Sequence, residues 1–272
     1  MPVYRDEVYR IYLDFLEVAE KKRRWSVFDD IPWNQLDQAR IPAEIGNRLE
    51  IFCAEEMYVP DYSSNGLELC RSMFGMAWFQ ATWACEESKH ALALREYLTR
   101  SRLRSEAEFS ALEDKVFAGH WQLPFSRARQ MACYGALQEA ATFLAYKTQR
   151  ELARQSCDPV LEAIFFNLGR DEAAHAGFYR AVLDLELALD RPGTVSDLAY
   201  VLANFKMPGD GLIEDYRERL TSTGAGISPR LFLQHVLWPL LAGARIGRDE
   251  IKTALKQQAI EPAAPVRVLA AL

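Results

Sequence analysis

The sequence repeats the spacing Glu-x-x-His in two segments that each have the pattern of a long helix. The first copy is Glu87 and His90 in CEESKH, and the second is Glu172 and His175 in RDEAAH. Residues three apart lie on one face of a helix, so each pair presents a carboxylate and an imidazole to the same metal ion. A single pair is usually just an exposed helical pair. Two copies on separate helices predict that these helices lie side by side and share a metal centre.

Apolar residues recur at helical spacing through most of the chain, and no segment alternates as a strand does. The expected helices span 4–16, 41–57, 67–100, 105–112, 124–155 and 159–189, followed by shorter ones at 195–205, 211–221, 229–244 and 249–258. Pro60 and the cluster SSNG at 63–66 predict the first long turn, and SCDP at 156–159 predicts another.

No segment has the composition of a linker between domains. We therefore expect an all-α fold with a single domain over residues 1–272. Its bundle core would span about 41–190, and C-terminal helices over about 194–260 would pack on that core.

A helical bundle that holds two metal ions takes one further glutamate from each of two other helices. Glu139 is a candidate because it lies in an otherwise apolar helix, in YGALQEAATFLAYK. Glu56 in IFCAEEMYVP is the second candidate, and the adjacent Glu55 is an alternative that helical phase only mildly disfavours. The chain then consists of two half-repeats, Glu56 to Glu87 and Glu139 to Glu172, with intervals of 31 and 33 residues.

The two half-repeats differ in where their turns are expected. The midpoint of the second falls on SCDP, so a hairpin bent there brings Glu139 and Glu172 to one height. In the first, a turn at 63–66 is off centre, and helical rise alone would leave its glutamates about 18 Å apart in height. An extended chain would close most of that gap. We therefore predict a kinked or extended segment near Val59–Gly66.

Four carboxylates and two imidazoles favour iron or manganese over metals that are held by thiolates. Four glutamates would also neutralise two divalent ions. An acidic residue precedes each motif glutamate, namely Glu86 and Asp171. Because metal-bound histidines usually give their second N–H to an acceptor, we expect Asp171 to orient His90 and Glu86 to orient His175. The alternative is that both acids lie on the surface.

Three segments around these residues resemble the soluble acyl-carrier-protein desaturases, both the plant stearoyl type and its shorter actinobacterial relatives. They are WACEESKHALALREYL at 83–98, QEAATF at 138–143 and RDEAAHAGFY at 170–179. Looser similarities in WSVFDDIP, EEMYVPDY and FKMPGDG extend the resemblance from about Trp25 to Tyr216. The chain departs from the plant pattern in a shorter loop before the first motif and a shorter C-terminal region.

The resemblance implies a ferritin-like four-helix bundle with a di-iron centre and additional N- and C-terminal helices. It also implies an enzyme that removes two hydrogens from an acyl chain carried on acyl carrier protein. Oxygen would be reduced to water with electrons from a ferredoxin, and the protein would be a homodimer. By position, two iron ions would be bound by Glu56, Glu87, His90, Glu139, Glu172 and His175. A proline four residues after the family's first ligand favours Glu56 over Glu55.

Three further residues match family positions. Thr142, three after Glu139, matches a threonine thought to help oxygen activation, although a hydroxyl bonded back to its own helix is the common alternative. Trp83 matches a tryptophan near the metal centre. Trp25 matches a tryptophan discussed as the point where electrons enter, and packing of the N-terminal segment on the bundle is its alternative role.

Composition excludes several other classes of protein. The 272 residues carry a net charge of −6, which argues against a general nucleic-acid-binding protein. No stretch approaches the roughly 18 apolar residues of a membrane-spanning helix, and the charged N-terminus does not resemble a signal peptide. The five cysteines are scattered, which is typical of reduced thiols rather than of a zinc site. We expect a cytoplasmic protein without a membrane span or nucleic-acid partner.

A substrate of this kind requires a narrow apolar tunnel between helices. Helical spacing from an expected ligand or from Trp83 makes four residues candidates for its walls: Met76, Phe79, Phe143 and Phe178. An acidic carrier protein would need a basic docking surface. The run Lys21–Arg24 is one candidate, and a group on the helix after the first motif is another, formed by Arg95, Arg100, Arg102 and Arg104.

Three other functions use a similar set of ligands. A di-iron hydroxylase or oxidase could act on a carrier-bound substrate in specialised biosynthesis. A ferritin-like iron store has the same ligands but a much shorter chain that assembles into cages. A radical-generating subunit would need a tyrosine close to the metals, and Tyr134 and Tyr146 lie nearby in the sequence.

Overall fold

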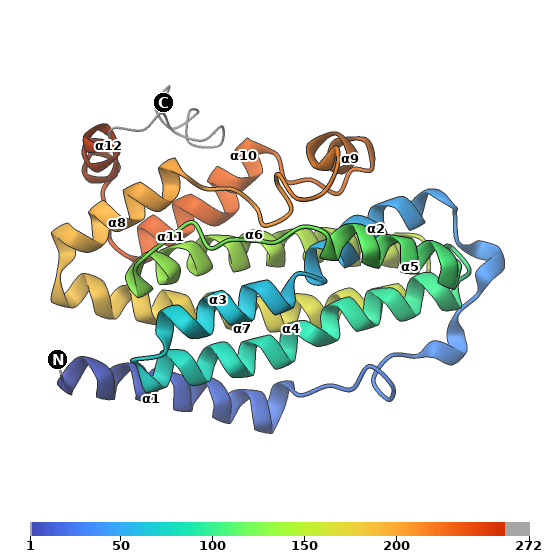
Figure 1. Ribbon diagram of the computed structural model, residues 1–272, viewed down its shortest axis with the longest axis horizontal. Helices are drawn as coiled ribbons and strands as arrows, with labels where there is room; N and C mark the ends of the chain where they lie inside the picture. The colour runs from blue at the N-terminus through green and yellow to red at the C-terminus, as the bar shows by residue number, and fades with distance from the viewer. Residues whose placement is uncertain (1, 259–272) are drawn as a thin grey trace.

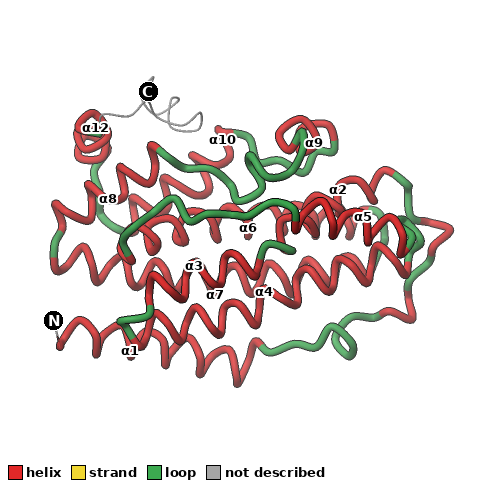
Figure 2. The backbone as a smooth tube through the Cα atoms, in the orientation of Figure 1, coloured by secondary structure: helices red, strands yellow, loops and turns green. Residues whose placement is uncertain are grey.

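The computed structural model describes residues 2–258, which contain helices and no β-strand (Figure 2). Two antiparallel hairpins form a central bundle (Figure 1). The first consists of α2 (Glu44–Glu56) and α3 (Val59–Cys70), which return along α4 (Phe74–Arg100). The second pairs α6 (Ala128–Gln155) with α7 (Pro159–Leu189). The predicted all-α bundle is confirmed.

Additional helices cover two opposite sides of the bundle (Figure 1). On one side α1 (Pro2–Val18), continued by the π-helix η1 (Ala19–Arg23), packs on α4 and α7. On the other side α8 (Arg191–Ala203) packs on α6 and α7. The remaining C-terminal elements are α9 (Tyr216–Ser222), α10 (Pro229–Phe232), the π-helix η4 (Leu233–Leu237), α11 (Trp238–Gly243) and α12 (Arg248–Gln257).

The connections add three short helices, namely the 3₁₀ helices η2 (Trp33–Gln35) and η3 (Gln38–Arg40), and α5 (Glu106–Phe117). The single domain expected over 1–272 includes residues 1 and 259–272, which lie outside the described residues. The C-terminal helices expected up to residue 260 likewise run two residues past them. The single domain stays a prediction. Within residues 2–258, no helix has both the length and the apolar composition that a membrane span requires.

The segment after α2 is helical, contrary to expectation. α3 includes all of Val59–Gly66, so the extended segment predicted there is wrong. Pro60 lies in the first turn of α3, where the missing N–H of proline costs no helical hydrogen bond. The polar residues that suggested a turn bond back to their own helix, as when Ser63 Oγ donates to the Val59 carbonyl at 2.6 Å. Gly66 permits close packing, since a Cβ there would overlap the side-chain amide of Gln80 on α4.

The first hairpin turns at residues 71–73, so α4 begins at Phe74 rather than near residue 67. This turn lies midway between Glu56 and Glu87, just as SCDP lies midway between Glu139 and Glu172. The height difference inferred from the sequence therefore does not arise. Both hairpins are symmetric about their glutamates, and only a short break at residues 57–58 separates α2 from α3.

The apolar core is divided into two clusters along the bundle. One contains residues from the first half of α4 and α6 and the last half of α7, including Phe79, Leu137 and Val182. The other contains the opposite halves of the same helices, including Leu94 and Phe165. All six predicted metal ligands are buried, and the four on α4 and α7 come from the parts of these helices between the two clusters. A polar centre is therefore enclosed by apolar layers on both sides.

Close contact between α6 and α7 depends on Gly135, because a Cβ there would overlap the ring of the buried Tyr179. We expect Gly135→Ala to lower the free energy of unfolding by about 1–3 kcal/mol, the usual cost of overpacking a rigid core. Gly177→Ala is the matched control, since nothing lies within 4 Å of its added Cβ. That exposed helical site should gain about 0.5–1 kcal/mol. Urea unfolding followed by circular dichroism measures the free energy of unfolding of both variants. Equal values for Gly135→Ala and Gly177→Ala would contradict the close packing at Gly135.

Candidate metal centre

Six side chains from α2, α4, α6 and α7 converge in the middle of the bundle. Their potential ligand atoms form two groups, and within each group all lie within 4.8 Å of one another. One group is Glu56, Glu87, His90 and Glu172, and the other is Glu87, Glu139, Glu172 and His175. Glu87 and Glu172 belong to both groups. The arrangement therefore offers two adjacent metal positions that share two carboxylates.

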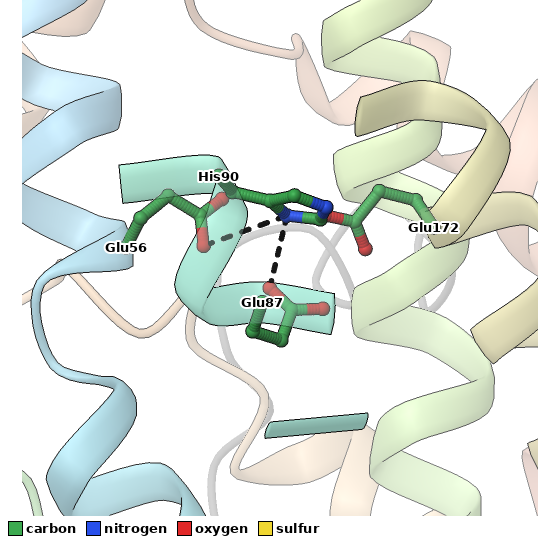
Figure 3. A group of neighbouring side chains, drawn as sticks. All are labelled: Glu56, Glu87, His90 and Glu172. Atoms are coloured by element: carbon green, nitrogen blue, oxygen red, sulfur yellow. Dashed lines mark ion pairs between the residues drawn. The ribbon is translucent and has the colours of Figure 1, made fainter. Parts of the chain in front are cut away.

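The first group surrounds the Nδ1 atom of His90 (Figure 3). Glu87 Oε2, one helical turn away on α4, lies 3.1 Å from this atom. Glu172 Oε1 approaches to 3.4 Å from α7, and Glu56 Oε2 lies at 3.9 Å from α2. Three different helices thus direct carboxylate oxygens at one imidazole nitrogen.

The second group repeats this pattern around the Nδ1 atom of His175. Glu87 Oε1 lies 2.9 Å away, Glu139 Oε2 lies 3.8 Å away and Glu172 Oε2 lies 3.9 Å away. Each shared glutamate therefore directs one oxygen at each histidine. This is the geometry of a carboxylate that bridges two cations.

Several of these atoms are buried without a hydrogen bond, although buried polar groups are normally satisfied. They are Glu87 Oε1, Glu139 Oε2, Glu172 Oε2 and the Nδ1 atoms of both histidines. All five belong to the two groups above. Unpaired oxygen and imidazole nitrogen atoms around one point are the donor set of a hard or borderline divalent metal. The residues present therefore fit a pair of iron or manganese ions.

The electrostatics of the chain alone also favour a bound cation. Burial and the charge of Glu87 raise the pKa of Glu56, while burial and the charge of Glu172 raise that of Glu139. Burial lowers the pKa of His90, but neighbouring carboxylates more than offset this and raise it well above its usual value. These carboxylates and imidazoles compete for protons that divalent ions would replace.

The acids that precede the motif glutamates lie behind the histidines. His175 Nε2 lies 2.9 Å from Glu86 Oε2, and His90 Nε2 lies 3.4 Å from Asp171 Oδ2. Both acids are buried rather than exposed on the surface. Each acid can accept the second N–H of a histidine and so leave Nδ1 unprotonated for a metal.

The two outer glutamates are each held by an aromatic donor. Trp83 Nε1 donates to Glu139 Oε1 at 3.1 Å, and the Tyr146 hydroxyl donates to Glu56 Oε1. In both cases the second oxygen is left facing the histidine. Tyr146 was not singled out as a support for Glu56, although it lies seven residues after Glu139 and hence on the same face of α6.

Glu55, the alternative to Glu56, points away from the centre. It accepts hydrogen bonds from the Tyr216 hydroxyl and from the Gly209 N–H at 3.3 Å. Burial raises the pKa of Glu55 to about 7 even though both hydrogen bonds lower it. Glu55 thus attaches the C-terminal segment to α2, and Glu56 is the glutamate in the cluster.

Two further predicted residues lie close to the centre. Thr142 Oγ1 donates to the carbonyl of Gln138 at 3.1 Å, which is the helical back-bond considered above as its alternative role. Trp25 is buried, and its Nε1 donates to Asp171 Oδ2 at 2.7 Å. A continuous path of hydrogen-bonding contacts therefore runs from Trp25 through Asp171 to His90.

A cavity of about 530 Å³ opens onto the carboxylates of the cluster. One wall is α6 from Met131 to Tyr146, which includes Thr142. The facing wall is formed by residues of the C-terminal segment 205–232, among them Phe205 and Phe232. Most of the lining side chains are apolar, so an alkyl chain can lie beside the cluster in contact with apolar surface.

The four residues expected to form tunnel walls do not line this cavity. Phe79 and Phe178 stack with ring centroids 3.5 Å apart on the side covered by α1, and Met76 is buried in the same apolar cluster. Phe143 is 37% exposed. Helical spacing from a ligand indicates that a residue lies on the same helix face as that ligand. It does not indicate on which side of the bundle the cavity lies.

The first candidate docking run is mostly engaged within the protein. Arg23 is buried, Lys21 pairs with Glu17, and Arg24 pairs with Glu20. In the second group, Arg100 and Arg104 also form ion pairs with glutamates. Docking of an acidic carrier at either group stays a prediction.

Comparisons with known proteins agree with this geometry. A family model described as fatty acid desaturase matches residues 60–227, more than half of the chain. The protein named as acyl-[acyl-carrier-protein] desaturase DesA1 of Mycobacterium tuberculosis H37Rv is 26% identical over 252 residues, which cover 83% of this chain and 72% of that protein. The chloroplastic stearoyl-[acyl-carrier-protein] 9-desaturase 6 of Arabidopsis thaliana is 30% identical over 127 residues, covering 45% and 32% of the two chains.

Two solved structures share the fold. The crystal structure of the acyl-ACP desaturase DesA2 of Mycobacterium tuberculosis H37Rv has a TM-score of 0.66 at 22% identity, covering 93% of this chain and 99% of that one. The R2-like ligand-binding oxidase of Sulfolobus acidocaldarius has a TM-score of 0.56 at 13% identity, covering 95% and 93%. These likenesses confirm the predicted ferritin-like bundle. The match over residues 60–227 shows that this chain belongs to the fatty acid desaturase family, the family of the acyl-[acyl-carrier-protein] desaturases.

Proposed function

We propose that the protein is an oxygen-dependent di-iron desaturase that introduces a double bond into an acyl chain carried on acyl carrier protein. The observation that carries this proposal is a pair of carboxylate–histidine groups that share Glu87 and Glu172 and face an apolar cavity. Electrons would come from a ferredoxin or a similar donor. A homodimer and a cytoplasmic location stay predictions.

In this proposal two iron ions would be held by the six residues of the cluster, with Glu87 and Glu172 shared by both positions. Glu56 and His90 would complete one position, and Glu139 and His175 would complete the other. When bound, the ions supply the oxygen-derived oxidising power that cleavage of an unactivated C–H bond requires and that side chains alone do not provide.

Neighbouring residues of the chain would hold this centre in place. Asp171 and Glu86 fix the histidine rings, while Tyr146 and Trp83 fix the outer glutamates. The acyl chain would lie along α6, beside Thr142, in the apolar cavity. Thr142 would assist oxygen activation after its hydroxyl turns from the Gln138 carbonyl towards the metal centre. The path Trp25–Asp171–His90 would carry electrons inward.

The supports of the outer glutamates give a testable prediction. Tyr146→Phe removes the donor to Glu56 Oε1, and Trp83→Phe removes the donor to Glu139 Oε1. Each change should weaken binding of one ion by about tenfold, since the lost partner of a ligand typically costs 10- to 100-fold. Titration with Fe²⁺ under anaerobic conditions measures both affinities. Tyr97→Phe is the control, because its hydroxyl bonds to Asp158 at the SCDP turn. An unchanged affinity in both variants would contradict these roles.

The function is tested by multiple-turnover assays with a panel of acyl carrier proteins that bear saturated chains of different lengths. Iron-loaded protein, ferredoxin, its reductase and oxygen are added, and the released acyl chains are analysed by gas chromatography. The proposal predicts an unsaturated product from at least one chain length. A hydroxylated product would instead identify a hydroxylase. Iron uptake into a large shell, with no acyl product, would identify an iron store.

A further inference from the structure

We propose that Arg23 is a positioning residue that couples the two halves of the metal centre, since its one guanidinium binds both acids that hold the histidines. The inference rests on the two-metal centre proposed above, but not on the identity of the substrate. The sequence suggested only a basic surface run at this point. Arg23 is instead 5% exposed, and it comes from η1, outside the four-helix bundle.

The contacts of Arg23 reach both sides of the centre. Its Nη1 atom donates to Asp171 Oδ1 at 2.5 Å and to Glu86 Oε2 at 3.0 Å. Its Nη2 atom also donates to Glu86 Oε2 at 3.0 Å. Asp171 lies behind His90 and Glu86 behind His175. The order of contacts is therefore histidine, acid, arginine, acid, histidine.

Arg23 is itself held from several directions. The π-turn of η1 brings the Arg24 N–H to the Ala19 carbonyl at 3.0 Å, and Arg23 lies at the end of this wider turn. Arg170 Nη2 donates to the Arg23 carbonyl at 2.6 Å. The ring of Phe15 lies 4.9 Å below the guanidinium carbon. Single π-turns are frequent at functional sites, and here the turn accompanies an inward-facing arginine.

The charges in the buried centre also call for this cation. The four ligand glutamates together with Glu86 and Asp171 provide six carboxylates. Two divalent ions offset four of these charges and Arg23 offsets a fifth. Lys89, whose Nζ lies 3.7 Å from Asp171 Oδ2, is placed to offset the sixth. Without Arg23, the partly exposed Lys89 would still pair with Asp171, but Glu86 would lose both of its contacts with the guanidinium.

A lysine at position 23 does not reproduce this role. The planar guanidinium presents several N–H groups in a fixed fork and reaches two carboxylates at once, whereas an ammonium is a point charge on a flexible chain. Loss of Arg23 should therefore release both acids, and through them both histidines. Loss of either acid alone should disturb only the histidine in front of it.

The test uses Co²⁺ as the probe in the full chain, with titrations followed by absorbance. Proton NMR of the Co²⁺-loaded protein then reports the shifted, exchangeable imidazole N–H signals of His90 and His175. Arg23→Gln and Arg23→Lys are expected to weaken the binding of both Co²⁺ ions by about 10- to 100-fold. Both variants should also shift the N–H signals of both histidines. Glu86→Gln should move only the His175 signal, and Asp171→Asn only the His90 signal.

Arg129→Gln is the matched control, because Arg129 bridges Asp190 and Asp197 away from the centre. It should lower stability without moving either signal. Arg23→Lys keeps the charge and tests the coupling if Arg23→Gln fails to fold. Wild-type affinity and unmoved signals in Arg23→Lys would overturn the proposal, as would movement of one signal alone. Fewer than two Co²⁺ ions bound by the wild type would overturn the metal centre itself, whereas two bound Co²⁺ ions together with no unsaturated product from the iron-loaded protein would overturn only the proposed function.

Discussion

Glu172→Gln is expected to reduce the iron content from two ions to at most one per chain and to lower acyl turnover by more than about a thousandfold, a loss of about 4 kcal/mol of transition-state stabilisation. Glu172 belongs to both groups, so replacing its carboxylate by a neutral amide affects both metal positions. Glutamine keeps the size of the side chain, and the fold should therefore persist.

The same substitution should stabilise the metal-free protein, by about 0.5–2 kcal/mol. The negative charge of Glu172 raises the pKa of both Glu56 and Glu139, since like charges buried close together disfavour one another. Removing one charge relieves that repulsion. A structural glutamate would show the opposite sign, because its loss would destabilise the chain.

Iron analysis and thermal unfolding with and without metal measure the two effects. Glu162→Gln on the same helix is the control, since Glu162 pairs with Arg150 near the surface. It should leave iron content and turnover unchanged. Two ions bound by Glu172→Gln, with normal turnover, would show that the shared carboxylate is not a ligand.

Ala145→Phe should abolish turnover of long acyl chains, by at least about a hundredfold in kcat/KM or 2.7 kcal/mol. Ala145 lies on α6 six residues after Glu139, and it shares the cavity wall with Phe52 and Ala225. A phenyl ring there fills space that the acyl chain would occupy. Because the cavity has room for the ring, the protein should still fold and bind two ions.

A graded series separates blocking from unfolding. Ala145→Val should retain activity but shift the preferred acyl chain to a different length, while Ala145→Phe is inactive with intact iron content. Assays with acyl carrier proteins of several chain lengths measure the shift. Full activity of Ala145→Phe on every chain length would show that the substrate binds elsewhere.

The sequence alone predicted the parts of the site that depend on one helix. Glu87 with His90, and Glu172 with His175, lie on one face whatever the surroundings. Glu139 was identifiable because a charged residue in an apolar helix needs a partner. Symmetry between the half-repeats then indicated the places of Glu86 and Asp171.

Features that depend on contacts between helices were not predictable in this way. The cluster at 63–66 has the composition of a turn, yet its hydroxyls bond to their own helix and Gly66 accommodates Gln80. Arg23 follows two basic neighbours in a run typical of a solvated face, and only the packing of η1 reveals that it is buried. The cavity lies on the side of α6 that faces residues 205–232, and no ligand spacing indicates that side.

The most direct test of a di-iron desaturase is a single turnover without an external electron donor. Protein loaded with two Fe²⁺ ions is mixed with acyl carrier protein that bears a saturated chain, and then with oxygen. The two ferrous ions supply two of the four electrons that reduce oxygen to water, and the acyl chain supplies the other two with its two hydrogens. Intact mass spectrometry should then show an acyl carrier protein lighter by two hydrogens, and no change with Glu172→Gln. Oxygen consumed by the wild type while every acyl chain keeps its mass would contradict the proposed function.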